Sequence, residues 1–285
     1  MMGALPLMRL PRRVVRSIRN GFLMLLDAAD RLAGRGDGLT PPRALHFVGG
    51  GDFRAVGRTF LEHFRNIGGL GPEDRILDIG CGTGRMAIPL LGYAGGRGEY
   101  IGFDICRPAI DWCTRNISPR NPRFRFFHAD IYNLEYNLRG TLSADAFRFP
   151  CDDGAVDFAF ATSVFTHMRA GEVRCYLHEL QRVLRSGGRA LVTFFICEDP
   201  PRLPAGQRRP AMNFRYPVSE GYTIDPDTPE RAIGYSEPWI RAAVGAAGFA
   251  VEDPIRYGSW SGRADGIDFQ DMVLLRKGAG PAERP

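Results

Sequence analysis

Lysine is almost absent from this sequence: Lys277 is the single lysine among 37 basic residues. The codon bias of a GC-rich genome explains this preference for arginine over lysine better than any function does. Long apolar runs are absent as well, and no stretch approaches the ~20 residues that a membrane-spanning helix needs. The sequence therefore predicts a protein without a transmembrane segment.

Cysteine pairs are also missing. The six cysteines form no Cys-x-x-Cys pair and no Cys/His spacing typical of a metal site. In a chain of 285 residues this pattern indicates reduced thiols, no bound metal and a cytoplasmic setting. Hydrophobic residues make up 44% and charged residues 24% of the chain, which is ordinary for a globular protein with one sizeable core.

Excess charge is confined to the N-terminus. The net charge of +5 equals the five arginines of residues 1–26, which hold no acid, and residues 27–285 balance at 32 basic against 32 acidic residues. Because a nucleic-acid-binding groove needs clustered cations, this neutral body argues against a nucleic-acid partner.

Residues 1–40 are expected to form a basic amphipathic segment followed by a linker rich in glycine and proline. Within residues 9–26, apolar side chains recur near helical spacing between arginines. Three interpretations remain open: peripheral contact with an anionic surface at the inner membrane face, an organelle transit peptide, and a helix packed on the domain.

Apolar runs alternate with amphipathic segments from residue 72 onward. Strands are expected over residues 75–79, 100–105, 124–131, 156–163, 189–197, 249–257 and 269–276. Helices are expected over residues 85–93, 108–117, 172–185 and 239–247. This alternation predicts an α/β fold, in which a mostly parallel sheet carries helices on both faces. Ligands of such sheets bind beyond the carboxyl ends of the strands.

The first expected strand ends in a turn, residues 78–84, whose glycines stand at alternate positions. Glycine lets the backbone turn sharply and approach a ligand without a Cβ in the way. A dinucleotide fingerprint starting at Gly80 would need its third glycine at position 85, where the sequence has Arg85. The alternating glycines have instead the spacing of methyltransferases.

Two acidic residues strengthen this interpretation. Asp104 ends the second expected strand, 20 residues beyond Gly84, where a carboxylate can accept hydrogen bonds from both hydroxyls of a ribose. Asp130 ends the third, where a side chain can accept from the amino group of adenine. Each acid alone is commonly a solvated loop residue. Fitting residues at the ends of three successive strands are much stronger evidence for a binding site.

At this point the chain resembles class I, S-adenosylmethionine-dependent methyltransferases. The motif from Asp78 to Gly84, the acids Asp104 and Asp130, and the segments 149–157 and 180–188 match the family in order and spacing. The resemblance covers about residues 72–197 closely, and the overall sequence is similar to bacterial methyltransferases of this general type. It implies a Rossmann-like three-layer sandwich, a seven-stranded sheet with its last strand antiparallel, and S-adenosylmethionine as cofactor.

The resemblance also implies the domain limits. A methyltransferase domain would span residues 41–277, with substrate-side inserts at about 133–150 and 198–235, and residues 278–285 would form a disordered tail. The aromatic residues of the second insert fit either contact with a flat acceptor or packing of the insert onto the core.

Individual site residues follow from the same resemblance. Gly80, Gly82 and Gly84 would line the methionine part of the cofactor together with Cys81, and Asp78 would help to orient its amino group.

The other predicted contacts lie on later strands. Asp104 with Ile105 would hold the ribose, and Asp130 with Ile131 the adenine. Ser163, at the end of the fourth strand, would lie near the sulfonium side of the pocket.

His167 is the candidate catalytic residue. Methyl transfer requires an acceptor aligned with the sulfonium methyl group, and a hydroxyl acceptor must also lose its proton. His167 follows the fourth strand at the rim of the expected pocket, and the ordinary pKa of histidine suits a base. The alternative is that His167 only fixes its loop by hydrogen bonds.

The sequence predicts O-methylation of a small-molecule, glycan or lipid-linked acceptor, and it leaves the oligomeric state open. One alternative is a non-catalytic binding or scaffold protein of this fold at a membrane surface. Another is transfer of an aminopropyl group, which would require an acidic amine pocket that the sequence does not show near His167.

Overall fold

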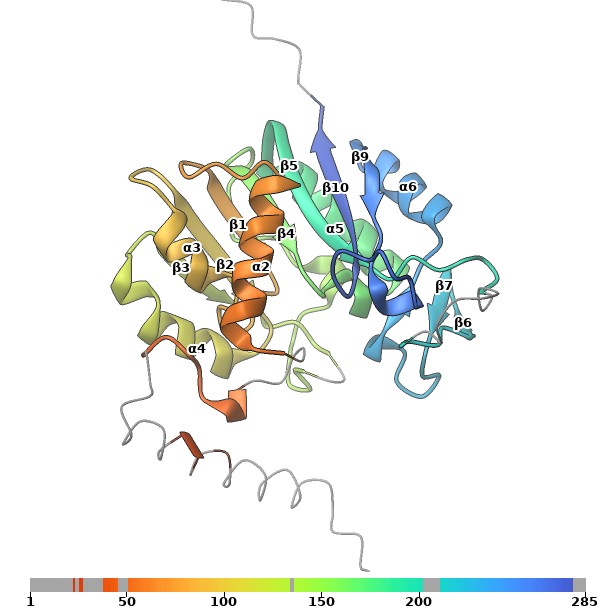
Figure 1. Ribbon diagram of the computed structural model, residues 1–285, viewed down its shortest axis with the longest axis horizontal. Helices are drawn as coiled ribbons and strands as arrows, with labels where there is room; N and C mark the ends of the chain where they lie inside the picture. The colour runs from red at the N-terminus through yellow and green to blue at the C-terminus, as the bar shows by residue number, and fades with distance from the viewer. Residues whose placement is uncertain are drawn as a thin grey trace, which may run out of the picture.

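The computed structural model describes residues 23, 26–27, 38–45, 51–133, 136–201 and 211–278. Within these residues, seven strands form the main sheet: β1 (Arg75–Ile79), β2 (Glu99–Asp104), β3 (Phe124–His128), β4 (Val156–Ala161), β5 (Leu184–Phe194), β9 (Phe249–Arg256) and β10 (Asp271–Lys277). Their order is β3-β2-β1-β4-β5-β10-β9 (Figure 1). Strands β1 to β5 are parallel, whereas β10 is antiparallel to both β5 and β9. The predicted Rossmann-like architecture is confirmed, including the antiparallel last strand.

Helices cover both faces of the sheet (Figure 1). One face carries α2 (Phe53–Asn66), α3 (Ala87–Tyr93) and α4 (Arg107–Asn116), and the other carries α5 (Ala170–Val183) and α6 (Glu237–Ala246). The buried side chains accordingly fall into two large hydrophobic clusters, one on each face. Burial on both faces explains why the central parallel strands are apolar along nearly their whole length.

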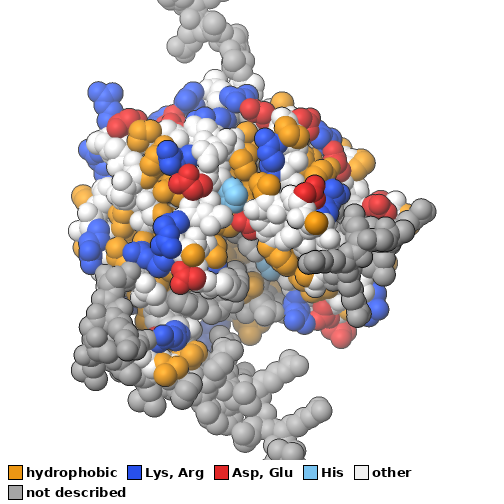
Figure 2. All heavy atoms as spheres, viewed as in Figure 1, with side chains coloured by type: hydrophobic (Ala, Val, Ile, Leu, Met, Phe, Trp, Pro, Cys, Tyr) orange, Lys and Arg blue, Asp and Glu red, His pale blue; other side chains and the backbone are white. Residues whose placement is uncertain are grey.

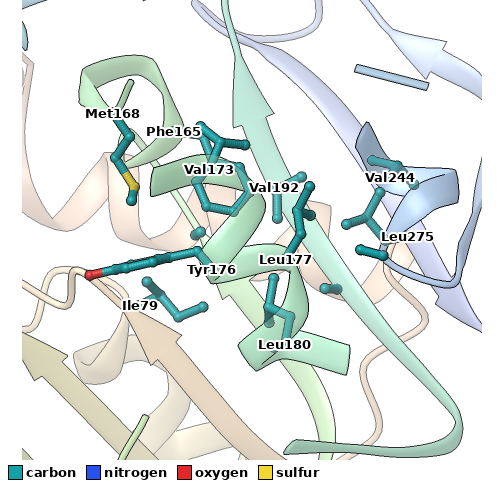
Figure 3. Close-up of a cluster of buried hydrophobic side chains, with 14 of the residues drawn as sticks. Ile79, Phe165, Met168, Val173, Tyr176, Leu177, Leu180, Val192, Val244 and Leu275 are labelled. Carbon is teal, nitrogen blue, oxygen red and sulfur yellow. The ribbon is translucent and has the colours of Figure 1, made fainter. Parts of the chain in front are cut away.

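The larger cluster lies between α5 and the sheet. Figure 3 shows Val173, Tyr176 and Leu177 of α5 in one buried group with Ile79 of β1 and Val192 of β5. Only a short connection links β4 to α5, so the first turn of α5 lies at the carboxyl edge of the sheet. This edge is where the sequence places the site.

Helix α2 was not among the expected elements. Asp52 caps it, because its carboxylate accepts a hydrogen bond of 2.6 Å from the backbone N–H of Ala55. Phe60 and Phe64 are buried against the sheet, and Phe64 stacks on Phe160 of β4 with ring centroids 4.2 Å apart. The buried residues of α2 are three phenylalanines and one glycine, so the apolar pattern is sparse in the sequence.

The junction between α5 and β5 differs from the expected one. The sequence predicts a helix over 172–185 and a strand over 189–197, but α5 ends at Val183 and β5 begins at Leu184. Gly187 therefore lies inside the strand, with a φ of 73°, where the pairing of β4 with β5 changes register. A bulge with a glycine at positive φ bends the strand without ending it. Apart from this junction, the expected ends lie within three residues of the observed ones.

Both expected inserts follow strands at the carboxyl edge. The first contains η3 (Ala144–Ala146), and the second contains β6 (Tyr216–Val218), β7 (Gly221–Thr223), β8 (Ile233–Gly234) and η5 (Pro229–Arg231). Strands β6, β7 and β8 form a separate antiparallel sheet. Phe214 and Tyr235 of the second insert are 4% and 1% exposed, so these two rings pack the insert onto the domain.

The face shown in Figure 2 carries side chains of both charges interspersed with one another. Among the residues that the structure describes, no helix is long and apolar enough to span a bilayer. The predicted basic helix over residues 9–26 lies outside the described residues, apart from Leu23 and Leu26. The predicted tail after Gly278 lies outside them as well.

Candidate active site

A cavity of about 160 Å³ opens at the carboxyl edge of the sheet. Because β1, β2 and β4 are parallel neighbours, the loops that follow them meet there. Most of the predicted site residues line this cavity, namely Gly80, Gly82, Asp104, Ile105, Ile131, Ser163 and His167. The geometry therefore brings together residues that lie far apart in the sequence.

The three glycines of the turn have φ angles of 76°, 50° and 77°, which disfavour any other residue. A Cβ at Gly80 would stand 2.5 Å from Cγ2 of Val164, and one at Gly84 would stand 2.4 Å from Cδ1 of Ile117. A Cβ at Gly82 would meet no atom within 4 Å. Gly80 and Gly84 thus permit close packing, whereas Gly82 leaves open space in which a ligand can approach the backbone.

Asp104 turns its carboxylate toward the glycine turn. Its Oδ2 accepts a hydrogen bond of 2.8 Å from the backbone N–H of Gly82, and its Oδ1 accepts one of 2.7 Å from that of Cys106. Burial raises the pKa of Asp104, and the two backbone N–H groups oppose this rise. Since each carboxylate oxygen has a second lone pair, Asp104 can also accept from hydroxyl groups of a ligand.

Asp130 does not line the cavity, although its neighbour Ile131 does. The hydroxyl of Thr141 in the first insert donates to Oδ2 of Asp130 at 2.7 Å. This hydrogen bond is the main reason that the pKa of Asp130 lies below its ordinary value. In this structure the carboxylate is therefore directed to the insert, a partner that strand-end spacing does not reveal.

Asp78 and Cys81 are buried and, like Gly84, do not line the cavity. Asp78 is 1% exposed, and Tyr100 donates a hydrogen bond of 2.5 Å to its Oδ2, while Oδ1 has no partner. Burial is the largest cause that raises the pKa of Asp78 to about 8. Burial also raises the pKa of the Cys81 thiol, which makes this thiol unreactive.

His167 lies in η4 (Phe165–His167), on the cavity wall. Its Nδ1 is 2.8 Å from the backbone oxygen of Glu230, and its Nε2 is 3.4 Å from Oγ of Ser163. A carbonyl oxygen can only accept, so Nδ1 carries the proton of the neutral ring. The lone pair of Nε2 is then the basic group of this side chain.

Residues that sequence reasoning missed complete the wall. Tyr136 of the first insert meets the ring of His167 edge-on, with centroids 6.3 Å apart, and Glu172 and Tyr176 come from α5. Burial raises the pKa of Glu172, whose Oε2 accepts a hydrogen bond of 2.7 Å from the backbone N–H of Arg169. Glu172 is thus an acid on the wall of the cavity that also holds His167. Glu172 could have been recognised from the sequence, because it lies in the first turn of the helix that follows the loop of His167.

No group of His, Cys, Asp and Glu in the described part of the chain could hold a metal ion. The six cysteines, all within the part of the chain that the structure describes, form no disulfide. The site therefore consists of a glycine turn, one buried carboxylate beside it, and a histidine whose basic nitrogen is defined by its neighbours.

This strand order with a glycine-turn cavity defines the class of the protein as the Rossmann-like fold of class I methyltransferases. Residues 77–192 match the family model described as a methyltransferase domain. The chain thus contains a class I, S-adenosylmethionine-dependent methyltransferase domain, whose cofactor is S-adenosylmethionine.

Named relatives are similar over part of their length. The 2-phytyl-1,4-naphtoquinone methyltransferase of Synechocystis is 28% identical over 127 residues, 45% of this chain and 47% of the relative. The 27-O-demethylrifamycin SV methyltransferase of Amycolatopsis mediterranei is 30% identical over 140 residues, 48% of this chain and 44% of the relative. The chain thus matches less than half the length of these two relatives.

A solved structure extends the likeness to nearly the whole chain. The crystal structure of the cyclase SpnF covers 93% of this chain and 96% of its own, with a TM-score of 0.51 and 18% identity. At this identity the similarity shows the fold alone, because one fold hosts many functions.

Proposed function

We propose that this chain transfers a methyl group from S-adenosylmethionine to an oxygen atom of a small-molecule, glycan or lipid-linked acceptor. The observation that carries the proposal is that three features share one cavity. They are the open space at Gly82, the carboxylate of Asp104 and the imidazole of His167. A sugar-binding carboxylate and a base are the two polar functions that such a reaction needs from the protein.

The residues of the cavity fit the cofactor. Gly82 leaves room where a side chain would stand, and Asp104 keeps lone pairs for two ribose hydroxyls. Ile105 and Ile131 add apolar surface for a nucleobase. S-adenosylmethionine supplies a methyl group that its sulfonium already activates, so the protein has to position the acceptor and exclude water.

His167 would be the final base of the reaction. As the acceptor oxygen bonds to the methyl carbon and loses its proton, Nε2 of His167 gains one proton, and the electron pair of the broken carbon–sulfur bond stays on sulfur. Nδ1–H remains bonded to the carbonyl oxygen of Glu230, which stabilises the charged ring and keeps it oriented.

The wall near His167 supports an organic acceptor with a ring. Tyr132, Tyr136 and Met168 add aromatic and apolar surface to the cavity, and Tyr132 is 50% exposed. Small-molecule sites are mostly apolar with a few placed polar groups, as this one is. The names of the two methyltransferase relatives denote small organic molecules, which agrees with this acceptor class.

A protein that keeps the fold and binds without catalysing is the alternative. The likeness to a cyclase shows that this fold is not restricted to methyl transfer. The alternative predicts binding of the cofactor with no product, so an assay of transfer separates the two.

The deciding assay uses S-adenosylmethionine labelled in its methyl group and fractionated extracts of the source cell. We expect label in a small-molecule or glycolipid fraction. His167→Ala should lower the rate about 10²–10⁴-fold and leave cofactor affinity nearly intact, because only proton transfer is lost. His178→Ala, an exposed histidine of α5, is the matched control and should transfer label normally. A folded wild-type chain that binds cofactor and labels no fraction would establish the scaffold alternative.

A further inference from the structure

A chain of hydrogen bonds connects His167 to the two strands on the far side of its loop. Oγ1 of Thr193 in β5 lies 2.7 Å from Oε1 of Gln270, the residue before β10. The amide Nε2 of Gln270 lies 3.0 Å from Oγ of Ser163, which lies 3.4 Å from Nε2 of His167. Nδ1 of His167 ends the chain at the carbonyl oxygen of Glu230. Residues more than 100 positions apart thus determine how one imidazole is held.

The direction of every proton along this chain is determined. Glu230 accepts from Nδ1, so Nε2 of His167 must accept, and the hydroxyl of Ser163 is its donor. Oγ of Ser163 in turn accepts from the amide N–H of Gln270, whose carbonyl oxygen accepts from Thr193. A reversed amide would draw the Ser163 proton toward Gln270 and take the donor away from His167. The carbonyl oxygen of Glu230 thus sets which nitrogen of His167 is basic, and the side-chain amide of Gln270 directs the Ser163 hydroxyl proton toward that nitrogen.

The backbone conformation of Ser163 shows that neighbouring residues hold this serine in place. Ser163 is the single non-glycine residue with positive φ, 59°, among the residues that the structure describes. Such a conformation is strained for an L-residue. The backbone N–H of Ser163 donates to Oγ1 of Thr193 at 2.8 Å, and Thr193 is fully buried. One threonine hydroxyl thus holds both the strained backbone and the amide that orients the serine.

Charged and titratable groups surround His167 on its other sides. Glu230 and Arg169 form an ion pair of 2.8 Å, Glu172 of α5 and Asp104 of β2 line the same cavity, and Tyr136 faces the ring. These groups are common to every variant used below. A difference in the pKa of His167 between variants therefore results from the substitution at Gln270.

We propose that Ser163 faces the acceptor and relays its proton to His167, and that Gln270 and Thr193 are positioning residues for this relay. The inference rests on the proposed methyl transfer to oxygen. The acceptor O–H proton passes to Oγ of Ser163 while the Ser163 proton passes to Nε2 of His167. Ser163 ends as a neutral hydroxyl and His167 as a cation. The acceptor oxygen gains the methyl group, and the electron pair of the carbon–sulfur bond remains on sulfur.

Nitrogen-15 NMR of the imidazole rings in the full chain tests the positioning and needs no acceptor. The His167→Ala variant identifies the His167 signals among the five histidines. We expect the neutral ring to carry its proton on Nδ1. Gln270→Glu should raise the pKa of His167 by about 1 unit, because a nearby carboxylate favours the cationic ring. Gln181→Glu, the same substitution on α5 away from the cavity wall, should leave this pKa unchanged.

Kinetics with an acceptor from the labelled-methyl assay test the relay. Ser163→Gly tolerates the positive φ and removes the hydroxyl, so kcat should fall about 10²-fold while the KM for cofactor stays constant. Thr193→Val should lower kcat in the same way, and Thr193→Ser, which keeps the hydroxyl, should restore most of the rate.

Three results would overturn the proposal: a neutral His167 protonated on Nε2, an unchanged pKa in Gln270→Glu, or wild-type kcat in Ser163→Gly. A wild-type chain that transfers no methyl group would refute the proposed function instead, and the NMR result would still decide whether Gln270 positions His167. The two failures are thus distinguishable.

Discussion

At the residue scale, neighbouring positions of one turn have different physical roles. Gly82 and Gly84 share a positive φ, yet a Cβ would meet open space at Gly82 and Ile117 at Gly84. Sequence spacing identifies both as glycines of one motif. The structure separates a position that is open toward a ligand from one required for packing against α4.

Gly84→Ala should therefore destabilise the fold more than Gly82→Ala. Both variants incur a cost of about 1–2 kcal/mol for the positive φ, but only the change at Gly84 adds a steric clash in a packed core. Gly82→Ala should instead weaken binding of S-adenosylhomocysteine, because its methyl group fills the open space. Urea denaturation and titration of the two proteins measure both effects. Equal stabilities, or unchanged affinity in Gly82→Ala, would contradict the assigned roles.

Asp78 makes a prediction about pH. Its pKa of about 8 in the folded chain lies far above the ~3.9 of an unfolded aspartate, and burial is the main cause. Between these values the folded state holds a proton that the unfolded state has lost, so the contribution of Asp78 to stability falls as pH rises and is lowest above pH 8.

Asp78→Asn removes this titration. The free energy of unfolding of the variant, relative to wild type, should therefore increase from about pH 5 to about pH 8. Urea denaturation at several pH values measures this difference, and both proteins share every other titrating group. A difference that stays constant with pH would show that Asp78 titrates normally.

Whether a site residue can be predicted from the sequence depends on which neighbouring groups bind its side chain. Asp104 directly ends a buried parallel strand and lines the cavity. Asp130 occupies a comparable place after β3, but Thr141 from the insert binds its carboxylate. Strand-end position is visible in a sequence, whereas the direction of a side chain beside a long insert is not.

At the element scale, apolar periodicity predicted the strands of the main sheet and four of its helices. It failed for α2, whose buried face consists of three phenylalanines and a glycine, and for the start of β5, where glycines form a bulge inside the strand. Apolar periodicity also could not predict the hydrogen bond between His167 and the backbone oxygen of Glu230 in η5. The two residues are 63 positions apart, and Glu230 lies in an irregular insert. Contacts of that range depend on the packing of the insert, for which no local pattern exists.

Helix α2 should contribute strongly to stability through its aromatic contacts. Phe64 is fully buried and stacks on Phe160, so Phe64→Ala should lower the free energy of unfolding by about 3–5 kcal/mol. Phe127→Ala is a matched control on edge strand β3, where the ring is 37% exposed, and should cost under about 1 kcal/mol. Chemical denaturation of the two variants gives the comparison. Similar losses would mean that α2 is only loosely attached to the sheet.

At the scale of the whole molecule, the parallel order of β3, β2, β1 and β4 brings the loops of the site together, and the first insert adds part of the cavity wall. The rigid sheet fixes the glycine turn and Asp104, while the inserts supply Tyr136 and the carbonyl oxygen that orients His167. The residues proposed to hold the cofactor thus lie on or beside the sheet, whereas Tyr136 and Glu230, which contact His167, lie in the two inserts.

Calorimetric titration of the full chain with S-adenosylhomocysteine tests the central claim that the cavity beside Gly82 and Asp104 holds the cofactor. We predict one ligand per chain. Asp104→Ala should bind about 5- to 150-fold more weakly, because the loss of an acceptor for buried hydroxyls costs about 1–3 kcal/mol. Asp111→Ala, on the outer face of α4, should bind like wild type. Folded protein that shows no binding at high micromolar ligand, or equal affinity in Asp104→Ala, would contradict the account.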